Sequence, residues 1–248
     1  MKRNLARCGW MGLVILGLAV SAAAQPAYTE VQIENHRCLV AGPENLPDNA
    51  PVVFILHGLG ANANNLFSLI EPMNLPPCRY VLPDGPISVG DNAYGWYDFQ
   101  TQSREDMIRS RDYLFRLIQR FSSLTDKPGH FRPVILMGFS QGGVMSLETG
   151  LNYNGKIEAI VSMSGYMWYP SQTLAHPLAP KRLPILVVHG TNDHIVPEDW
   201  TQTMVKALKG AGYHPVFQEF PMGHQITPDS LSAVTEFLHK VMAHQSPQ

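Results

Sequence analysis

The stretch PVILMGFSQGG, residues 133–143, joins a short apolar run to a glycine-rich turn. The apolar residues 134–137 are typical of a strand that is buried on both faces of a parallel sheet. Residues 143–151 then predict a helix. Ser140 is therefore expected on a sharp strand-to-helix turn, in the pattern Gly-x-Ser-x-Gly.

The glycines around Ser140 have a steric reason. A Cβ atom at either flank would clash with the adjacent strand and helix backbones. The turn raises the serine hydroxyl above the sheet, and it points the backbone N–H of Gln141 and the positive end of the following helix at any oxyanion formed beside it. The turn thus predicts a nucleophile, but an ordinary glycine-rich turn would show the same pattern, so Ser140 needs catalytic partners elsewhere.

Predicted strands and helices alternate along most of the chain, which indicates one α/β domain with a mostly parallel central sheet flanked by helices. The first strand, 31–40, alternates only partly and is expected at an antiparallel edge. Further strands are expected at 52–56, 79–82, 134–137, 157–163, 184–188 and 215–220. Helices are expected at 103–121, 143–151, 197–209 and 228–242.

Residues 1–24 differ in character from the rest. Basic residues precede an apolar run of eleven residues, 10–20, and small residues follow it, which is the pattern of a secretory signal peptide. An uncleaved membrane anchor is the alternative, but a spanning helix needs about 20 residues. We therefore expect a periplasmic or secreted protein, with a mature domain at 25–248 and no stable membrane span.

Cleavage after Ala24 would leave 15 Lys and Arg residues against 20 Asp and Glu residues. This acidic balance argues against nucleic acid as a partner. Cleavage would also leave two cysteines, Cys38 and Cys78. In an oxidising compartment the pair can form a disulfide, but spacing alone does not bring two cysteines together, so the paired and the free states stay open.

Ser140 needs a histidine to accept its proton and an acid to orient that histidine. His224 lies in the loop after the last predicted strand, and Asp193 lies in the loop after the strand before it. Successive parallel strands end at the same edge of a sheet, so these two side chains are expected within hydrogen-bond reach. His194 is then a neighbour, and the other acids are worse placed, on helix starts or inside a strand: Asp199, Asp229 and Glu219.

Other loops at this edge supply candidate binding groups. The backbone N–H of Leu59, in the loop after strand 52–56, can face a reacting carbonyl, whereas His57 is expected to order that loop. The candidate walls of an acyl pocket come from the loops after two other strands: Trp96, Met167 and Trp168. Each ring could instead only bury its loop against the body.

The motifs together resemble the phospholipase/carboxylesterase family of α/β-hydrolases, which includes small carboxylesterases, lysophospholipases and acyl-protein thioesterases. The matching segments follow the family's order: HGLG at 57–60, PDGP at 83–86, WYD at 96–98, GFSQGG at 138–143, HGTND at 189–193 and MGH at 222–224. The resemblance implies an α/β-hydrolase fold, a Ser140–Asp193–His224 triad, and an oxyanion hole formed by Leu59 and Gln141. Two features depart from the family: many members are cytosolic, and Ala61 stands where many have Asp.

The expected function is an exported serine carboxylesterase that cleaves small, short-chain acyl esters through an acyl-enzyme intermediate. A lysophospholipase or an acyl thioesterase is the alternative within the enzyme class, and a binding protein on an inactive hydrolase scaffold is the alternative outside it. Bulky rings at the candidate walls favour short acyl chains. No metal or cofactor is expected, because the histidines lack a clustered ligand spacing.

Overall fold

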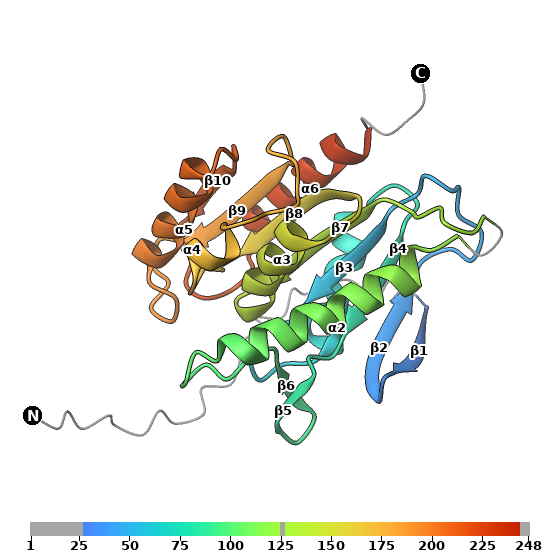
Figure 1. Ribbon diagram of the computed structural model, residues 1–248, viewed down its shortest axis with the longest axis horizontal. Coiled ribbons are helices and arrows are strands. Elements are labelled where there is room, and N and C mark those ends of the chain that lie inside the picture. Colours follow the sequence, from blue (N-terminus) through green and yellow to red (C-terminus); the bar gives the residue numbers. More distant parts are fainter. Residues whose placement is uncertain (1–26, 125–126, 244–248) are drawn as a thin grey trace, which may run out of the picture.

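An eight-stranded sheet forms the centre of the computed structural model, which describes residues 27–124 and 127–243 (Figure 1). β4, β3, β7, β8, β9 and β10 run parallel to one another, and β2 and β1 extend the β4 side as an antiparallel edge. The order across the sheet is β1 (Tyr28–Ile33), β2 (His36–Ala41), β4 (Arg79–Pro83), β3 (Val52–Leu56), β7 (Val134–Phe139), β8 (Ile157–Met163), β9 (Ile185–Gly190) and β10 (Val216–Phe220). The predicted single α/β domain with a mostly parallel sheet is confirmed.

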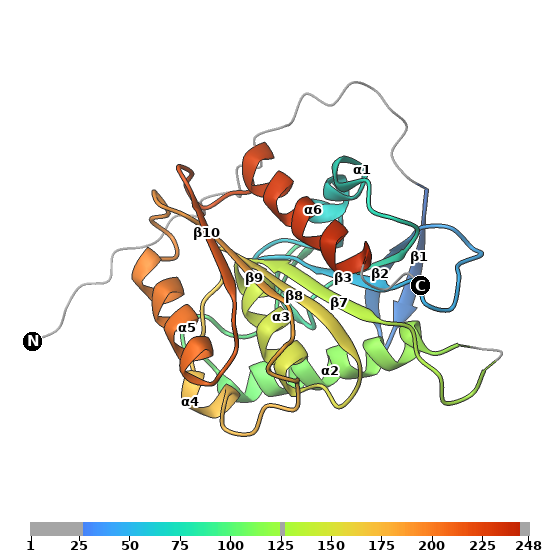
Figure 2. The ribbon, with the colours of Figure 1, turned by 90° about the horizontal axis from the view of Figure 1, so that it is seen from above.

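Helices cover both faces of the sheet (Figure 2). The core on one face is formed with α2 (Arg104–Ser122), α3 (Gln141–Asn152) and α5 (Glu198–Gly210). The core on the other face is formed with the 3₁₀ helix η1 (Ala63–Leu69), α1 (Ile70–Met73) and α6 (Pro228–Ala243). The short helix α4 (Pro170–Thr173) follows β8. Burial on both faces explains why β3, β7 and β9 are apolar without alternation.

The segment expected as one edge strand, 31–40, is instead a hairpin of β1 and β2. Its turn consists of Glu34 and Asn35, which have φ angles of 52° and 65°. Positive φ at both central residues is the geometry that matches the twist of a two-residue hairpin. A glutamate at such a position is uncommon, so the turn lacked the usual Asn-Gly or Asp-Gly signal.

A second small hairpin lies in the long loop after β4, where no strand was expected. It consists of β5 (Ile87–Gly90) and β6 (Ala93–Gly95), and Figure 1 shows it projecting away from the main sheet. Tyr94 exchanges backbone hydrogen bonds with the loop after β3, at Gly60 and Ala61. This hairpin therefore braces the loop that carries Leu59.

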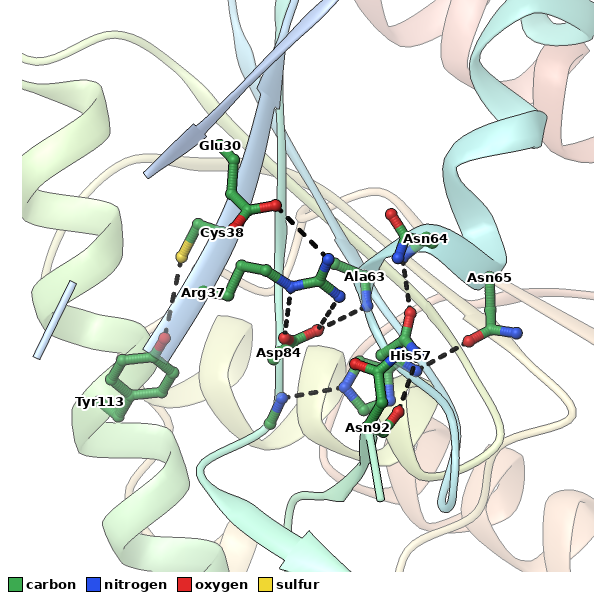
Figure 3. A network of polar contacts seen from close by, with 12 residues as sticks. Glu30, Arg37, Cys38, His57, Ala63, Asn64, Asn65, Asp84, Asn92 and Tyr113 are labelled. Atoms are coloured by element: carbon green, nitrogen blue, oxygen red, sulfur yellow. Dashed lines mark hydrogen bonds and ion pairs between the residues drawn. The ribbon is translucent and has the colours of Figure 1, made fainter. Parts of the chain in front are cut away.

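The possible disulfide between Cys38 and Cys78 does not form: both cysteines are free and buried. Cys38 packs in the core on the α2 face, where its Sγ lies 3.8 Å from the hydroxyl oxygen of Tyr113 (Figure 3). Cys78 packs in the core on the opposite face. The sheet therefore separates the two thiols, and burial raises the pKa of each to about 11.

The expected signal peptide lies outside the described residues. Within the described ranges, no helix combines the length and the apolar character that a membrane span requires.

Candidate active site

The turn between β7 and α3 holds Ser140 in a conformation that a non-glycine residue rarely adopts, with φ 54° and ψ −119°. Its backbone N–H donates to the carbonyl oxygen of Met163 at 2.8 Å. A Cβ atom on Gly142 would lie 2.0 Å from the carbonyl oxygen of Leu56, and one on Gly138 would lie 2.4 Å from the Gly142 backbone. The steric reason inferred for both glycines is confirmed.

Asp193 and His224 meet in a short hydrogen bond at this edge of the sheet. Nδ1 of His224 donates to Oδ2 of Asp193 at 2.7 Å, while Oδ1 accepts the backbone N–H groups of Ile195 and Val196, each at 2.9 Å. Burial alone would raise the pKa of Asp193, but the hydrogen bonds from His224 and from the backbone outweigh it, so the pKa lies below its ordinary value. An ionised Asp193 keeps the proton of a neutral His224 on Nδ1 and leaves Nε2 free to accept one.

Ser140 and His224 face the same cavity, which has a volume of about 410 Å³. The ring of Phe139 supports His224, with the ring centroids 4.7 Å apart. The cavity thus brings together a hydroxyl, an imidazole and, behind it, a carboxylate, which is the arrangement needed to activate a serine. Its other lining residues are Gly58, Leu59, Phe99, Gln141, Tyr166, Asn192, His194, Ile195, Val196, Gly223 and Gln225.

The loop after β3 lies directly against the turn that carries Ser140. A Cβ atom on Gly58 would lie 3.3 Å from Cβ of Ser140. The backbone N–H groups of Leu59 and Gln141 have no hydrogen-bond partner within residues 27–124 and 127–243. Two free donors beside a nucleophile suit an oxyanion, because they need no rearrangement when negative charge develops.

The side chain of Gln141 has a second role that the sequence did not reveal. Its Oε1 accepts the backbone N–H of Trp96 at 2.8 Å, and its Nε2 donates to the carbonyl oxygen of Tyr97 at 2.8 Å. This buried amide therefore ties the start of α3 to the chain that follows β6. Only the three-dimensional approach of these segments, 44 and 45 residues apart in sequence, identifies the contact.

His57 orders the loop before Leu59, as expected. Nδ1 donates to the carbonyl oxygen of Gly58 at 2.7 Å, and Nε2 accepts the backbone N–H of Gly85 at 2.9 Å. Burial lowers the pKa of His57 to about 4, so the ring is neutral at ordinary pH. Figure 3 also shows Asp84, whose carboxylate binds Arg37 and the backbone N–H of Ala63 and so anchors the start of η1.

The residues expected to form the acyl wall are placed differently. Trp96 is fully buried in the core, where its Nε1–H donates to the carbonyl oxygen of His57 at 2.9 Å, and it does not line the cavity. Met167 packs against the core on the α3 face. Trp168 stands one layer behind the wall, with its ring centroid 5.9 Å from that of Phe99 and 4.8 Å from that of Tyr166.

The aromatic residues that do reach the cavity are Phe99 and Tyr166. Both follow strands whose carboxyl ends carry the site, so the sequence indicated that they lie near it. The sequence did not indicate where each ring points, because that direction depends on packing against residues from other loops. The hydroxyl groups of Tyr166 and Tyr97 lie 2.7 Å apart, which fixes the Tyr166 ring in the wall.

Two serines at the end of β8 have unpaired hydroxyl groups. Ser162 and Ser164 are buried, and their hydroxyl groups have no hydrogen-bond partner among the described residues. Ser164 has a positive φ of 48°, and its backbone N–H donates to the carbonyl oxygen of Val188.

The described part of the chain also contains no group of three or more His, Cys, Asp and Glu side chains placed to hold a metal ion.

Comparison with known proteins adds three kinds of similarity. A family model described as Phospholipase/Carboxylesterase matches residues 39–242. A protein of Gibberella zeae named acyl-protein thioesterase 1 is 30% identical over 216 residues, which cover 77% of this chain and 90% of that protein. Another of that name, from Mycosarcoma maydis, is 28% identical and covers 84% of this chain and 98% of its own.

Solved structures share the architecture. The crystal structure of esterase PE8 is 25% identical, has a TM-score of 0.66, and covers 82% of this chain and 99% of its own. The carboxylesterase of Bacillus cereus is 16% identical, has a TM-score of 0.67, and covers 83% and 94%. At that identity the second likeness concerns the fold alone.

Proposed function

Because this chain belongs to the phospholipase/carboxylesterase family, we propose that it is a serine carboxylesterase in which Ser140, Asp193 and His224 form the catalytic triad. The observation that carries the proposal is the 2.7 Å contact between Asp193 and His224 beside a cavity that also contains Ser140. The relatives named as thioesterases and esterases support hydrolase chemistry.

The proposed reaction has two steps. Oγ of Ser140 attacks the ester carbonyl while Nε2 of His224 takes the hydroxyl proton, and Asp193 stabilises the imidazolium that results. The N–H groups of Leu59 and Gln141 receive the oxyanion. As the tetrahedral intermediate collapses, the leaving alcohol takes the proton from Nε2. Water then attacks the acyl-enzyme and gives a proton to the same nitrogen. As the bond between the acyl carbon and Oγ breaks, Oγ of Ser140 takes that proton from Nε2 and the acid is released.

A fluorophosphonate probe tests this proposal against the alternative of a binding protein on an inactive scaffold. Such a probe forms a bond only with an activated serine. Labelling of the wild-type protein, together with no labelling after Ser140→Ala, supports the enzyme. A folded wild-type protein that resists the probe and hydrolyses no ester would favour the binding protein.

The preferred acyl group is proposed to be short. The aromatic side chains of Phe99 and Tyr166 stand in the cavity wall, and Trp168 backs both of them. A closed wall leaves no room for an additional methylene, so that group is not buried and does not contribute the roughly 0.8 kcal/mol that burial would give. We expect kcat/KM for p-nitrophenyl esters to peak at about two to six acyl carbons and to fall for longer chains.

Removal of a wall ring tests the cause of this preference. Phe99→Ala is expected to move the peak toward longer chains, because it opens space where the acyl group would end. The matched control is Phe131→Ala, which removes another exposed ring, from the loop before β7, without touching the cavity. A wild-type profile that rises steadily to palmitoyl esters would contradict the short-chain proposal.

A thioesterase is the second candidate, and the names of the Gibberella zeae and Mycosarcoma maydis relatives favour it. The same attack by Ser140 cleaves a thioester, so the two candidates differ in the leaving group. An oxyester and a thioester with the same acyl chain therefore separate them. A thioester-to-oxyester ratio of kcat/KM that is much larger than the ratio of their uncatalysed hydrolysis rates would support the thioesterase.

Export is also part of the proposal, and it rests on the composition of residues 1–24. If they form a cleaved signal peptide, the protein recovered outside the cytoplasm begins at or close to Gln25. Intact-mass measurement on that protein tests the prediction. The mass should not change on reduction, because Cys38 and Cys78 lie on opposite faces of the sheet. Secreted protein that retains Met1 would contradict cleavage.

A further inference from the structure

His189 is a fully buried histidine that the proposed reaction does not use. It is the last residue but one of β9, and the loop after β9 carries Asp193. We propose that His189 is a positioning residue, which holds the 193–196 loop so that Asp193 meets His224 in the geometry that proton transfer requires. This inference rests on the proposed function of the triad and concerns the same site.

The ring of His189 makes two polar contacts, and one of its partners makes a third. Nε2 lies 3.1 Å from the carbonyl oxygen of Val196, and Nδ1 lies 3.0 Å from the hydroxyl oxygen of Thr201 in α5. That hydroxyl also lies 2.7 Å from the carbonyl oxygen of Gly165, in the loop after β8. The ring therefore connects β9, α5 and two loops that end at the site.

The proton on the ring can be placed from these partners. A backbone carbonyl only accepts hydrogen bonds, so Nε2 of His189 carries the proton that Val196 receives. Burial lowers the pKa of His189 below its ordinary value, although the nearby Asp193 carboxylate opposes that shift. The ring is therefore neutral, and Nδ1 carries a lone pair that faces the hydroxyl of Thr201. Because that hydroxyl has one proton, Nδ1 and the carbonyl oxygen of Gly165 are alternative acceptors for it.

The link from His189 to the acid passes through one residue, Val196. The backbone N–H of Val196 donates to Oδ1 of Asp193 at 2.9 Å, and its carbonyl oxygen accepts from Nε2 of His189. Nε2 is 3.9 Å from Oδ2 of Asp193, which is too long for a hydrogen bond. His189 thus acts on the carboxylate indirectly, by fixing the residue that binds its other oxygen.

Removal of the His189 imidazole should lower kcat more than it lowers the affinity for substrate. Without the imidazole, the carbonyl of Val196 loses its buried partner, and the 193–196 loop can shift to find another. A displacement of about 1 Å in a catalytic group can lower the rate about 10²-fold. His194, Ile195 and Val196 of this loop line one side of the cavity, whereas Leu59 and Gln141 on the other side are not part of it, so KM should rise less than kcat falls.

The test compares two substitutions of different chemistry. His189→Leu keeps the volume but removes both polar atoms, and it is expected to lower kcat about 10- to 100-fold with KM changed less than about threefold. His189→Gln can place an amide N–H at Val196 and an amide oxygen at Thr201, so it should recover most of the lost kcat. Thr201→Val removes the hydroxyl that faces Nδ1 and donates to Gly165, but it keeps the contact between Nε2 and Val196, so its kcat should lie between those of the wild type and the leucine variant.

A spectroscopic readout separates positioning from general stability. In the wild-type protein, the Nδ1 proton of His224 should give a downfield proton resonance in the NMR spectrum, because it is held by a carboxylate at short distance. This resonance should disappear or move upfield in His189→Leu and persist in His189→Gln. The measurement needs no substrate, so it stands even if the protein hydrolyses none of the esters tested.

Tyr213→Phe is the matched control. It removes another buried side-chain hydrogen bond to a backbone carbonyl, that of Ala179, and both residues lie shortly before the amino ends of β10 and β9, whereas the candidate site lies at the carboxyl ends. It should lower the melting temperature but leave kcat and the His224 resonance unchanged. A folded His189→Leu protein with wild-type kcat and an unchanged resonance would overturn the proposal. Equal losses in the leucine and glutamine variants would do the same. Absence of Ser140-dependent turnover in the wild type would instead refute the proposed function.

Discussion

Replacement of Ser140 by alanine is expected to lower kcat for ester hydrolysis by roughly 10⁴- to 10⁶-fold, as when a member of another serine triad is removed. The hydroxyl oxygen is the attacking atom in the proposed reaction, and no remaining side chain of the cavity can replace it. The change removes little volume, and the turn keeps its backbone hydrogen bond to Met163. The variant should therefore fold, which a thermal unfolding curve beside the kinetic assay would check.

Ser162→Ala is the matched control for this prediction. Ser162 is also a buried serine next to the turn, where its Oγ packs close to Gly143 and Gly165, but its hydroxyl has no hydrogen-bond partner within the described ranges. Its removal should leave turnover near that of the wild type. If a folded Ser140→Ala protein kept near-normal turnover, Ser140 would not be the nucleophile.

The second large effect is expected for Asp193→Asn. An asparagine amide would donate to Nδ1 of His224, so the imidazole proton would move to Nε2, where it blocks acceptance of the serine proton. Other triads lose about 10⁴-fold in kcat from this change. The loss should appear in kcat for the same p-nitrophenyl ester, since neither carboxylate oxygen faces the cavity.

Asp199→Asn provides the comparison. Asp199 is an exposed residue in the first turn of α5, and it lies six positions after Asp193. Its replacement should change kcat by less than about twofold, because Asp199 does not line the cavity, and should cost at most about 0.3–1 kcal/mol of stability through the loss of a charge near a helix N-terminus. Equal losses in the two variants, or the reverse ranking, would show that Asp193 is not the catalytic acid.

The strands and helices were predictable wherever the apolar residues form a long run or repeat with a regular period. Strand 157–163 and the helix at 228–242 were predicted to within one residue of β8 and α6. In both cases a long apolar or periodic segment forms its element for local reasons that the residues themselves display. The two hairpins, β1–β2 and β5–β6, were missed because their turns use positive φ at Glu34, Asn35 and Asn92 without the glycine that usually signals it.

The sequence by itself determined the framework of the candidate site. The turn at Ser140 is a local structure, set by its glycines, and the loops with Asp193 and His224 follow from two parallel strands that must end at one edge. Those constraints depend on chain order and on backbone geometry, so they can be inferred from the sequence without a structure.

Tertiary structure alone decided which side chains face the cavity and which support it. Trp96 turned into the core and Phe99 into the wall, although the two are three residues apart in one loop. Cys38 and Cys78 were separated by the sheet, and His189 was placed behind Asp193 by contacts from α5 and from the loop after β8. The physical reason is common to all of them: a side chain's direction is set by packing and hydrogen bonds from segments far away in the sequence, whereas the strand-to-helix turn is set by its own residues.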